Sequence, residues 1–183
     1  ALALDDDLRS IVPEIPDDGH TIRIRHLVHH VSGLRDMWDL LRLAGWRQDD
    51  VITEDDALEI VPRQRALNFP PGDQYLYSNT GYTLLAVIVR RVSGKSLREY
   101  THDRILAPLG MTRSHFHDDH TEIVHGRTQA YVPREGGSGY SISIPVFDLC
   151  GTTSLFTTVE DLARWDANFD HGTVGGDLLD LRQ

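Results

Sequence analysis

The sequence predicts an α+β fold that is mainly helical and carries one small β-hairpin. Apolar residues recur every three or four positions through the middle of the chain, which is typical of amphipathic helices. A serine–isoleucine alternation from Tyr140 to Ile144 instead indicates a strand with one dry face, beside the glycine-rich stretch 136–139. At 183 residues, of which 40% are hydrophobic, the chain has enough apolar material for a core.

The clearest helix is expected over residues 80–93, followed by Gly94 as a C′ glycine. Its apolar positions stand at helical spacing, at Leu84, Leu85, Ile88 and Val92. A capping box at Ser96-Leu97-Arg98-Glu99 predicts the next helix, which ends near Ala107-Pro108. The short link between these helices requires a sharp turn.

Three further helices are expected from local signals. One spans about residues 23–31 and stops at Gly33, and another opens at the Thr53 cap and ends before Pro62. The last begins after Thr158 and carries Leu162, Trp165 and Phe169 on one face. Residues 129–132 and 140–144 form the expected hairpin.

We therefore divide the chain into four parts within one partial domain, 1–183. They are a polar, proline-punctuated lead-in (1–20), a helical region (21–126), a hairpin and loop (127–158), and a late helix and tail (159–183).

Composition excludes several classes of function. The formal net charge of −10 opposes nucleic-acid binding, which depends on clustered cations. Cys150 is the only cysteine, so neither an intrachain disulfide nor a cysteine cage for a metal is available. The basic residues are seventeen arginines and one lysine, Lys95, so a mechanism that needs two lysines cannot be supplied by this chain.

Tyr77 and Asn79 are the candidate functional residues, two positions apart and just before the 80–93 helix. A free phenol ionises near pH 10, so a tyrosine that acts as a base near pH 7 needs nearby cations. Asn79 offers both a donor and an acceptor to an amide-like substrate. The spacing alone leaves a structural alternative open, in which Asn79 caps the helix and Tyr77 packs.

Several motifs in sequence order resemble the penicillin-recognising serine hydrolases. They are Pro71-Gly72-x-x-Tyr75-x-Tyr77-Ser78-Asn79-x-Gly81-Tyr82, Ile105-x-x-Pro108-Leu109-Gly110-Met111, the upstream His26-Leu27-Val28-x-His30-x-Ser32-Gly33-Leu34, and the downstream Leu155-Phe156-Thr157-Thr158-x-Glu160-Asp161-Leu162. The likeness covers about residues 21–171 and is strongest to class C β-lactamases, D-alanyl-D-alanine carboxypeptidases and family VIII esterases.

This resemblance implies that the chain is the mainly helical portion of the β-lactamase/transpeptidase-like fold. Most of the central antiparallel sheet is then expected to be missing, which predicts an exposed apolar face or a partner chain, or self-association, that covers it. Tyr77 corresponds to the family's proton-transfer tyrosine and Asn79 to its substrate-binding asparagine. The family's Ser-x-x-Lys motif and its Lys-Thr-Gly or His-x-Gly strand are expected outside residues 1–183, so this chain alone is predicted to be inactive.

The resemblance implies a parent that acts on a β-lactam, a D-alanyl peptide or a small ester through an acyl-serine intermediate, without a cofactor. The alternative is a noncatalytic binding or scaffold module of the same fold. Because family members are commonly exported or membrane-anchored, it also implies an extracytoplasmic parent. The particular substrate, compartment and oligomer stay open.

Three other features are interpreted as structural. Lys95 is expected about 27 Å from Tyr77 along a largely helical path, too far to tune it. Gly94-Lys95-Ser96 lacks the glycine that a phosphate-binding loop needs at position 89, where Val89 stands. The segment from His115 to His120 has ligand types for zinc or nickel, but we expect solvated histidines in a polar loop and no metal.

Overall fold

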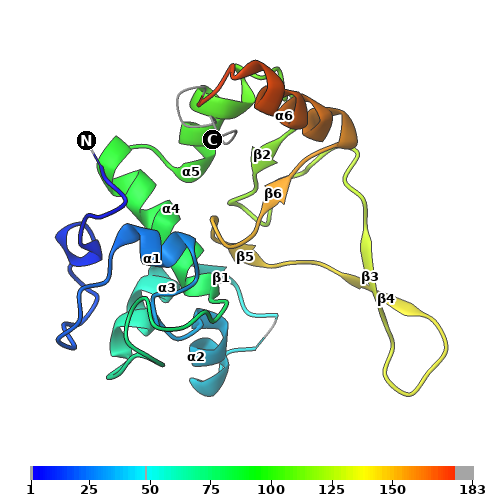
Figure 1. The fold of residues 1–183 in the computed structure, drawn as a ribbon. Coiled ribbons are helices and arrows are strands. Elements are labelled where there is room, and N and C mark those ends of the chain that lie inside the picture. Colours follow the sequence, from blue (N-terminus) through cyan, green and yellow to red (C-terminus); the bar gives the residue numbers. More distant parts are fainter. Residues whose placement is uncertain (1, 48, 176–183) are drawn as a thin grey trace.

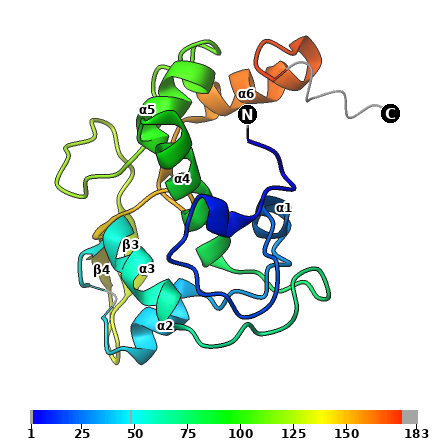
Figure 2. The same cartoon turned by 90° about the vertical axis from the view of Figure 1, so that its left-hand side faces the viewer.

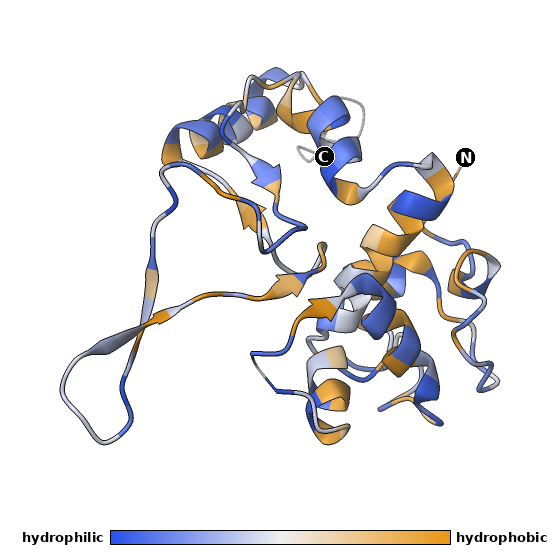
Figure 3. Ribbon diagram, turned by 180° about the vertical axis from the view of Figure 1, so that it is seen from behind, coloured by the Kyte–Doolittle hydropathy of each residue, from blue (hydrophilic) through white to orange (hydrophobic). Residues whose placement is uncertain are grey.

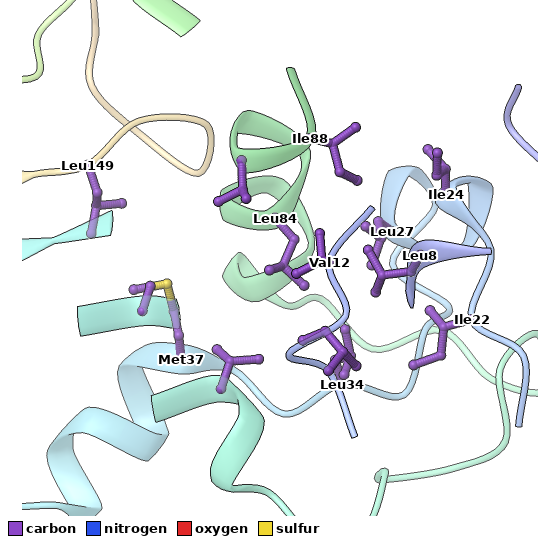
Figure 4. Packing of buried hydrophobic residues seen from close by; sticks show 14 of the residues in the cluster. Leu8, Val12, Ile22, Ile24, Leu27, Leu34, Met37, Leu84, Ile88 and Leu149 are labelled. Carbon is purple, nitrogen blue, oxygen red and sulfur yellow. The ribbon is translucent and has the colours of Figure 1, made fainter. Parts of the chain in front are cut away.

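Helix α4 (Asn79–Ser93) lies at the centre of the fold in the computed structural model, which describes residues 2–47 and 49–175 (Figure 1). It ends where Gly94 adopts the left-handed conformation, as the sequence predicts. The buried face of α4 includes Leu84, Val87 and Ile88. Figure 4 shows Leu84 and Ile88 pointing toward apolar side chains of several other segments.

Three short helices surround α4, and their bounds are α1 (Ile24–Val28), α2 (Met37–Leu43) and α3 (Glu54–Ile60). Helix α1 approaches α4 closely because Gly81 has no side chain, and a Cβ there would lie 3.1 Å from the carbonyl oxygen of Leu27. Helix α3 begins at the predicted Thr53 cap, whose hydroxyl accepts from the amide of Asp56. A 3₁₀ turn, η2 (Val61–Arg63), follows it.

The first twenty residues contribute to the core, which the description of a polar lead-in did not anticipate. Leu8, in the 3₁₀ turn η1 (Leu8–Ser10), is fully buried, and so are Val12 and Ile15. The segment passes beside α1 and α4 (Figure 2). Leu2 and Leu4 stay exposed, so only part of the apolar side chains of this segment enter the core.

The chain beyond α4 is held by shorter elements. Helix α5 (Leu97–Thr101) begins at the predicted capping box and continues into a π-helical turn, η3 (His102–Leu106). Helix α6 (Val159–His171) begins at Thr158, again as predicted. No described helix has both the length and the apolar character that crossing a bilayer requires.

The described strands form three separate two-stranded sheets. Their pairs are parallel β1 (Ile52–Thr53) with β5 (Phe147–Asp148), antiparallel β2 (His115–Phe116) with β6 (Leu155–Phe156), and antiparallel β3 (Ala130–Pro133) with β4 (Tyr140–Ser143). The last pair is the predicted hairpin, with Tyr131 opposite Ile142, and it projects away from the helices (Figure 1). Figure 3 shows no hydrophobic residues (orange) at the tip of this hairpin, whereas several helices around α4 contain them.

The five predicted helices are thus confirmed, with ends that shift by a few residues. Helix α2 and the one-turn η1 are not predicted by the sequence pattern. Helix α2 is short and begins at Asp36, whose side chain accepts from the amide of Trp38. The end of the predicted tail, residues 176–183, lies outside the described residues.

Candidate active site

The segment that carries Tyr77 is fixed to the end of α1 by backbone hydrogen bonds. The amide of Gly72 donates to the carbonyl of Val31 at 2.8 Å, and the amide of Leu76 donates to the carbonyl of His30 at 3.0 Å. Since both bonds are long-range, the position of Tyr77 depends on the residues that follow α1 as well as on the start of α4.

The ring of His30 packs against two tyrosines, Tyr77 and Tyr82. This histidine has a positive φ of 56°, uncommon for a non-glycine residue, and its Nδ1 accepts from the amide of Ser78 at 3.3 Å. Its ring lies 4.6 Å from that of Tyr77 and 5.2 Å from that of Tyr82, measured between centroids. His30 thus packs directly against Tyr77.

Asn79 is the centre of a hydrogen-bond network at the start of α4. Its Oδ1 accepts from the hydroxyl of Tyr77 at 3.0 Å and from the hydroxyl of Thr152. Its Nδ2 donates to Oδ2 of Asp36 at 2.7 Å, and its backbone amide donates to the same oxygen at 2.6 Å.

These partners fix the orientation of the Asn79 carboxamide. A carboxylate can only accept hydrogen bonds, so Nδ2 of Asn79 must face Asp36. The hydroxyls of Tyr77 and Thr152 then donate to Oδ1 of Asn79. Both acceptor positions of Oδ1 are occupied, and one N–H of Nδ2 stays available to a carbonyl of a substrate. Tyr77 uses its hydroxyl hydrogen toward Asn79 and keeps its oxygen free to accept, on an exposed side chain.

Thr152 reaches Asn79 because its loop passes very close to α4. The neighbouring Gly151 has a φ of 104°, and a Cβ there would lie 2.3 Å from the carbonyl oxygen of Tyr82. Only glycine fits this approach without a shift of the backbone.

Asp36 and Thr152 are further functional candidates, which the structure adds to Tyr77 and Asn79. Asp36 carries a local signal, since it precedes a short apolar run and caps α2. Nothing local points to Thr152, which lies 73 residues from Asn79 in sequence.

Lys95 lies at the opposite end of α4 from Asn79, as predicted. Its Nζ pairs with Oδ2 of Asp103 at 2.6 Å, and about half of its side chain is exposed. Ser96 caps α5 through the amide of Glu99, so the Gly94-Lys95-Ser96 stretch has a structural role.

The histidine-rich segment differs from the expectation of a solvated loop. His115 belongs to β2 and is half-buried, and His117 is only 5% exposed. The ring of His117 stacks on Phe156 with centroids 4.4 Å apart. Burial lowers the pKa of both histidines below the ordinary range of imidazole.

Comparisons with known proteins agree with the motif pattern. A family model described as Beta-lactamase matches residues 1–182. The chain is 28% identical over 182 residues to a D-aminopeptidase of Gluconobacter oxydans, covering 96% of this chain and 33% of that protein. It is also 28% identical to penicillin-binding protein 4* of Bacillus subtilis, covering 90% of this chain and 39% of that protein.

A solved structure, the octameric penicillin-binding protein homologue from Pyrococcus abyssi, superposes with a TM-score of 0.78 at 26% identity. That match covers 94% of this chain and 41% of the other. The chain thus spans roughly a third to two fifths of the length of these relatives. The motifs, the fold and the match over nearly every residue lead to one conclusion: the chain belongs to the beta-lactamase family, with a β-lactamase/transpeptidase-like fold.

Proposed function

We propose that this chain supplies the tyrosine and the asparagine of the active site of a serine acyl hydrolase. The observation that carries the proposal is the network in which Asn79 joins Tyr77, Asp36 and Thr152. A side chain that only caps a helix needs none of these side-chain partners, whereas a substrate-orienting amide must be held in one orientation.

In the proposed reaction, a serine hydroxyl attacks the acyl carbon, and water later hydrolyses the acyl-serine. Tyr77 transfers a proton between the serine, a lysine and the leaving group, and the free N–H of Asn79 donates to the acyl or amide carbonyl. The substrate is a β-lactam, a D-alanyl peptide or a small ester. The names of the relatives, a D-aminopeptidase and a penicillin-binding protein, support this substrate range.

The test is the turnover of the full-length protein with Tyr77→Phe, assayed on a chromogenic cephalosporin, a D-alanyl peptide and a nitrophenyl ester. We expect kcat to fall by roughly 10²-fold or more on the accepted substrate. Tyr75→Phe is the matched control, because Tyr75 is also exposed and its ring also contacts His30. An unchanged kcat for Tyr77→Phe would remove Tyr77 from the mechanism.

We also propose that residues 1–183 alone are inactive. The sequence contains no Ser-x-x-Lys, since the position three before Lys95 is Val92, and Lys95 pairs with Asp103. A labelled penicillin should therefore leave the isolated chain unmodified in an intact-mass measurement. A stoichiometric adduct would contradict this.

A noncatalytic scaffold is the competing function within the same fold. A scaffold requires that the full-length protein lacks Ser-x-x-Lys. The sequence of the full-length protein, and its labelling by penicillin, therefore distinguish a scaffold from a serine acyl hydrolase.

We also propose that most of the central sheet lies outside residues 1–183 and that, in the full-length protein, it covers α6. Val159, Leu162 and Phe169 are exposed on this helix, at a spacing that places apolar groups along one side. Covering by a second chain is the alternative, and the octameric relative supports self-association. Analytical ultracentrifugation of the isolated chain with and without Leu162→Glu tests it, since a monomer in both cases would exclude self-association.

A further inference from the structure

We propose that His115, His117 and Glu122 bind one divalent ion of the zinc type. The three residues come from β2 and the loop that follows it, far along the chain from Tyr77 and Asn79. None of the activities proposed above uses them.

The separations of their ligand atoms match the size of a metal ion. Nε2 of His115 lies 3.4 Å from Nδ1 of His117, and Nδ1 of His117 lies 3.6 Å from Oε2 of Glu122. All three atoms lie within 4.8 Å of one another. Tetrahedral zinc with bonds of about 2.0–2.2 Å places its ligands about 3.3–3.6 Å apart. An ion therefore fits with only a small movement of the third ligand.

The same distances are poor for hydrogen bonds between the side chains. A nitrogen pair at 3.4 Å is at the limit of a hydrogen bond, and 3.6 Å is beyond it. The second nitrogen of His117, Nε2, is buried and has no hydrogen-bond partner. An ion at Nδ1 would replace these long contacts by one metal bond, while Nε2 would carry the ring hydrogen.

The two histidines are already held in position. They stand two residues apart along an extended segment, so their side chains share one face. The backbone of β2 pairs with β6, and the amide of His117 donates to the carbonyl of Ser154 at 2.8 Å. The ring of His117 is further fixed by its stacking on Phe156.

The charged groups around the cluster orient Glu122 and lower the affinity of the cluster for a metal ion. Arg98 donates to both oxygens of Glu122, at 2.7 and 2.9 Å, and to Asp118 at 2.8 Å. Such donors commonly hold a ligating carboxylate in place. Arg127 lies 4.8 Å over the ring of Phe156. Because two arginines balance the two carboxylates, and Nε2 of His117 lacks an acceptor, we expect weaker binding than at a closed structural zinc site.

Imidazole ligands favour zinc, nickel or copper over magnesium and calcium. Two histidines and one glutamate also form a ligand set that leaves a fourth position open in zinc proteins. Of the three ligands, His115 lines a cavity of about 1240 Å³ together with Arg98 and Phe156, so the cluster borders this cavity on the His115 side.

The test is calorimetric titration of the chain with zinc chloride, followed by His115→Gln and Glu122→Gln. We expect one ion per chain and at least about tenfold weaker binding in each variant, since loss of even an outer-shell partner costs 10–100-fold. His125→Gln is the matched control, because His125 lines the same cavity, is exposed and lies outside the ligand set. Magnesium chloride should give no comparable binding.

Two results would overturn the proposal: no zinc binding by the unaltered chain, or binding that both ligand variants retain. Loss of binding in His120→Gln, with His115→Gln unchanged, would also overturn it by placing the ion at Asp119, His120 and Asp148. Zinc anomalous diffraction from the unaltered chain gives an answer that does not depend on variants that fail to fold. An anomalous peak between the three ligand atoms is expected, and a peak elsewhere contradicts the assignment.

Discussion

The segment that ends with α4 and the segment that follows it are stabilised in different ways. Among the described residues, the main hydrophobic cluster lies within residues 8–88, except for Leu149. Residues 97–171, which we call the polar region, contribute only Leu149 to that cluster and carry several partly buried side-chain hydrogen bonds and ion pairs. Arg98 binds Asp118 and Glu122, and His120 binds Asp148.

The candidate active site lies where these two regions meet. Asn79 begins the helix around which the apolar cluster packs, whereas Thr152 belongs to the polar region. The comparison indicates that nonspecific apolar packing fixes the framework, while directional hydrogen bonds place the side chain that completes the site. Substitutions in the two regions should separate these two contributions.

The largest effect is expected from a cavity in the apolar cluster. Leu84 is 1% exposed, so Leu84→Ala should lower the free energy of unfolding by about 2–5 kcal/mol. Leu43 is 85% exposed, and Leu43→Ala should change it by about 0.5 kcal/mol or less. Urea unfolding followed by circular dichroism measures both. Equal effects would mean that the cluster around α4 does not carry the stability.

The next largest effect is expected at a buried carboxylate of the polar region. Asp161 is 1% exposed and accepts from the amide of Arg113 at 2.9 Å and from the hydroxyl of Ser114 at 2.8 Å. Burial opposes its ionisation, but these hydrogen bonds and Arg164 outweigh burial and hold its pKa below the ordinary value.

Asp161→Ala removes the acceptor of the Arg113 amide and of the Ser114 hydroxyl and should cost about 1–3 kcal/mol, compared with Glu160→Ala on the exposed side of α6. The same unfolding experiment checks it. If the two variants are equally stable, the hydrogen bonds of Asp161 do not contribute to the stability of the polar region.

A smaller, pH-dependent effect is expected where the first residues meet the end of α4. The hydrogen bonds of Arg91 lower the pKa of Glu14 from 4.5 to about 2, with Oε1 2.6 Å from Nη2 of Arg91. The folded state therefore holds the Glu14 proton less tightly than the unfolded state, and the pair stabilises the fold above about pH 4.5. That contribution disappears as the pH falls from 4.5 toward 2.

Glu14→Gln should cost about 1 kcal/mol or less at pH 7, since the pair is partly exposed, and less still at pH 3. Urea unfolding across this pH range tests it. A cost that grows as the pH falls would have the wrong sign for the ion pair.

The smallest effect is expected in the projecting hairpin. Ile142 is exposed although it lies opposite Tyr131, so Ile142→Ser should cost about 0.5 kcal/mol or less. Thermal unfolding of the variant measures this. A loss as large as that of Leu84→Ala would show that the hairpin is covered in solution.

Much of the local structure could be predicted because its causes are local. The Ser96 and Thr53 capping boxes, Gly94 and the periodicity through Ile88 act within a few residues, and each predicted element was found. Helix α2 was missed because it is short, and its start depends on an aspartate that also serves Asn79.

The sequence by itself determined the family, the helix caps, the hairpin and the choice of Tyr77 and Asn79, whose roles in catalysis stay predictions. Only the tertiary structure decided that Asp36 and Thr152 hold Asn79, that Leu8 belongs to the core, and that His117 is buried. The physical reason is distance along the chain. Periodicity and capping record interactions between near neighbours, whereas contacts across 43 or 73 residues form only when apolar burial has brought those segments together.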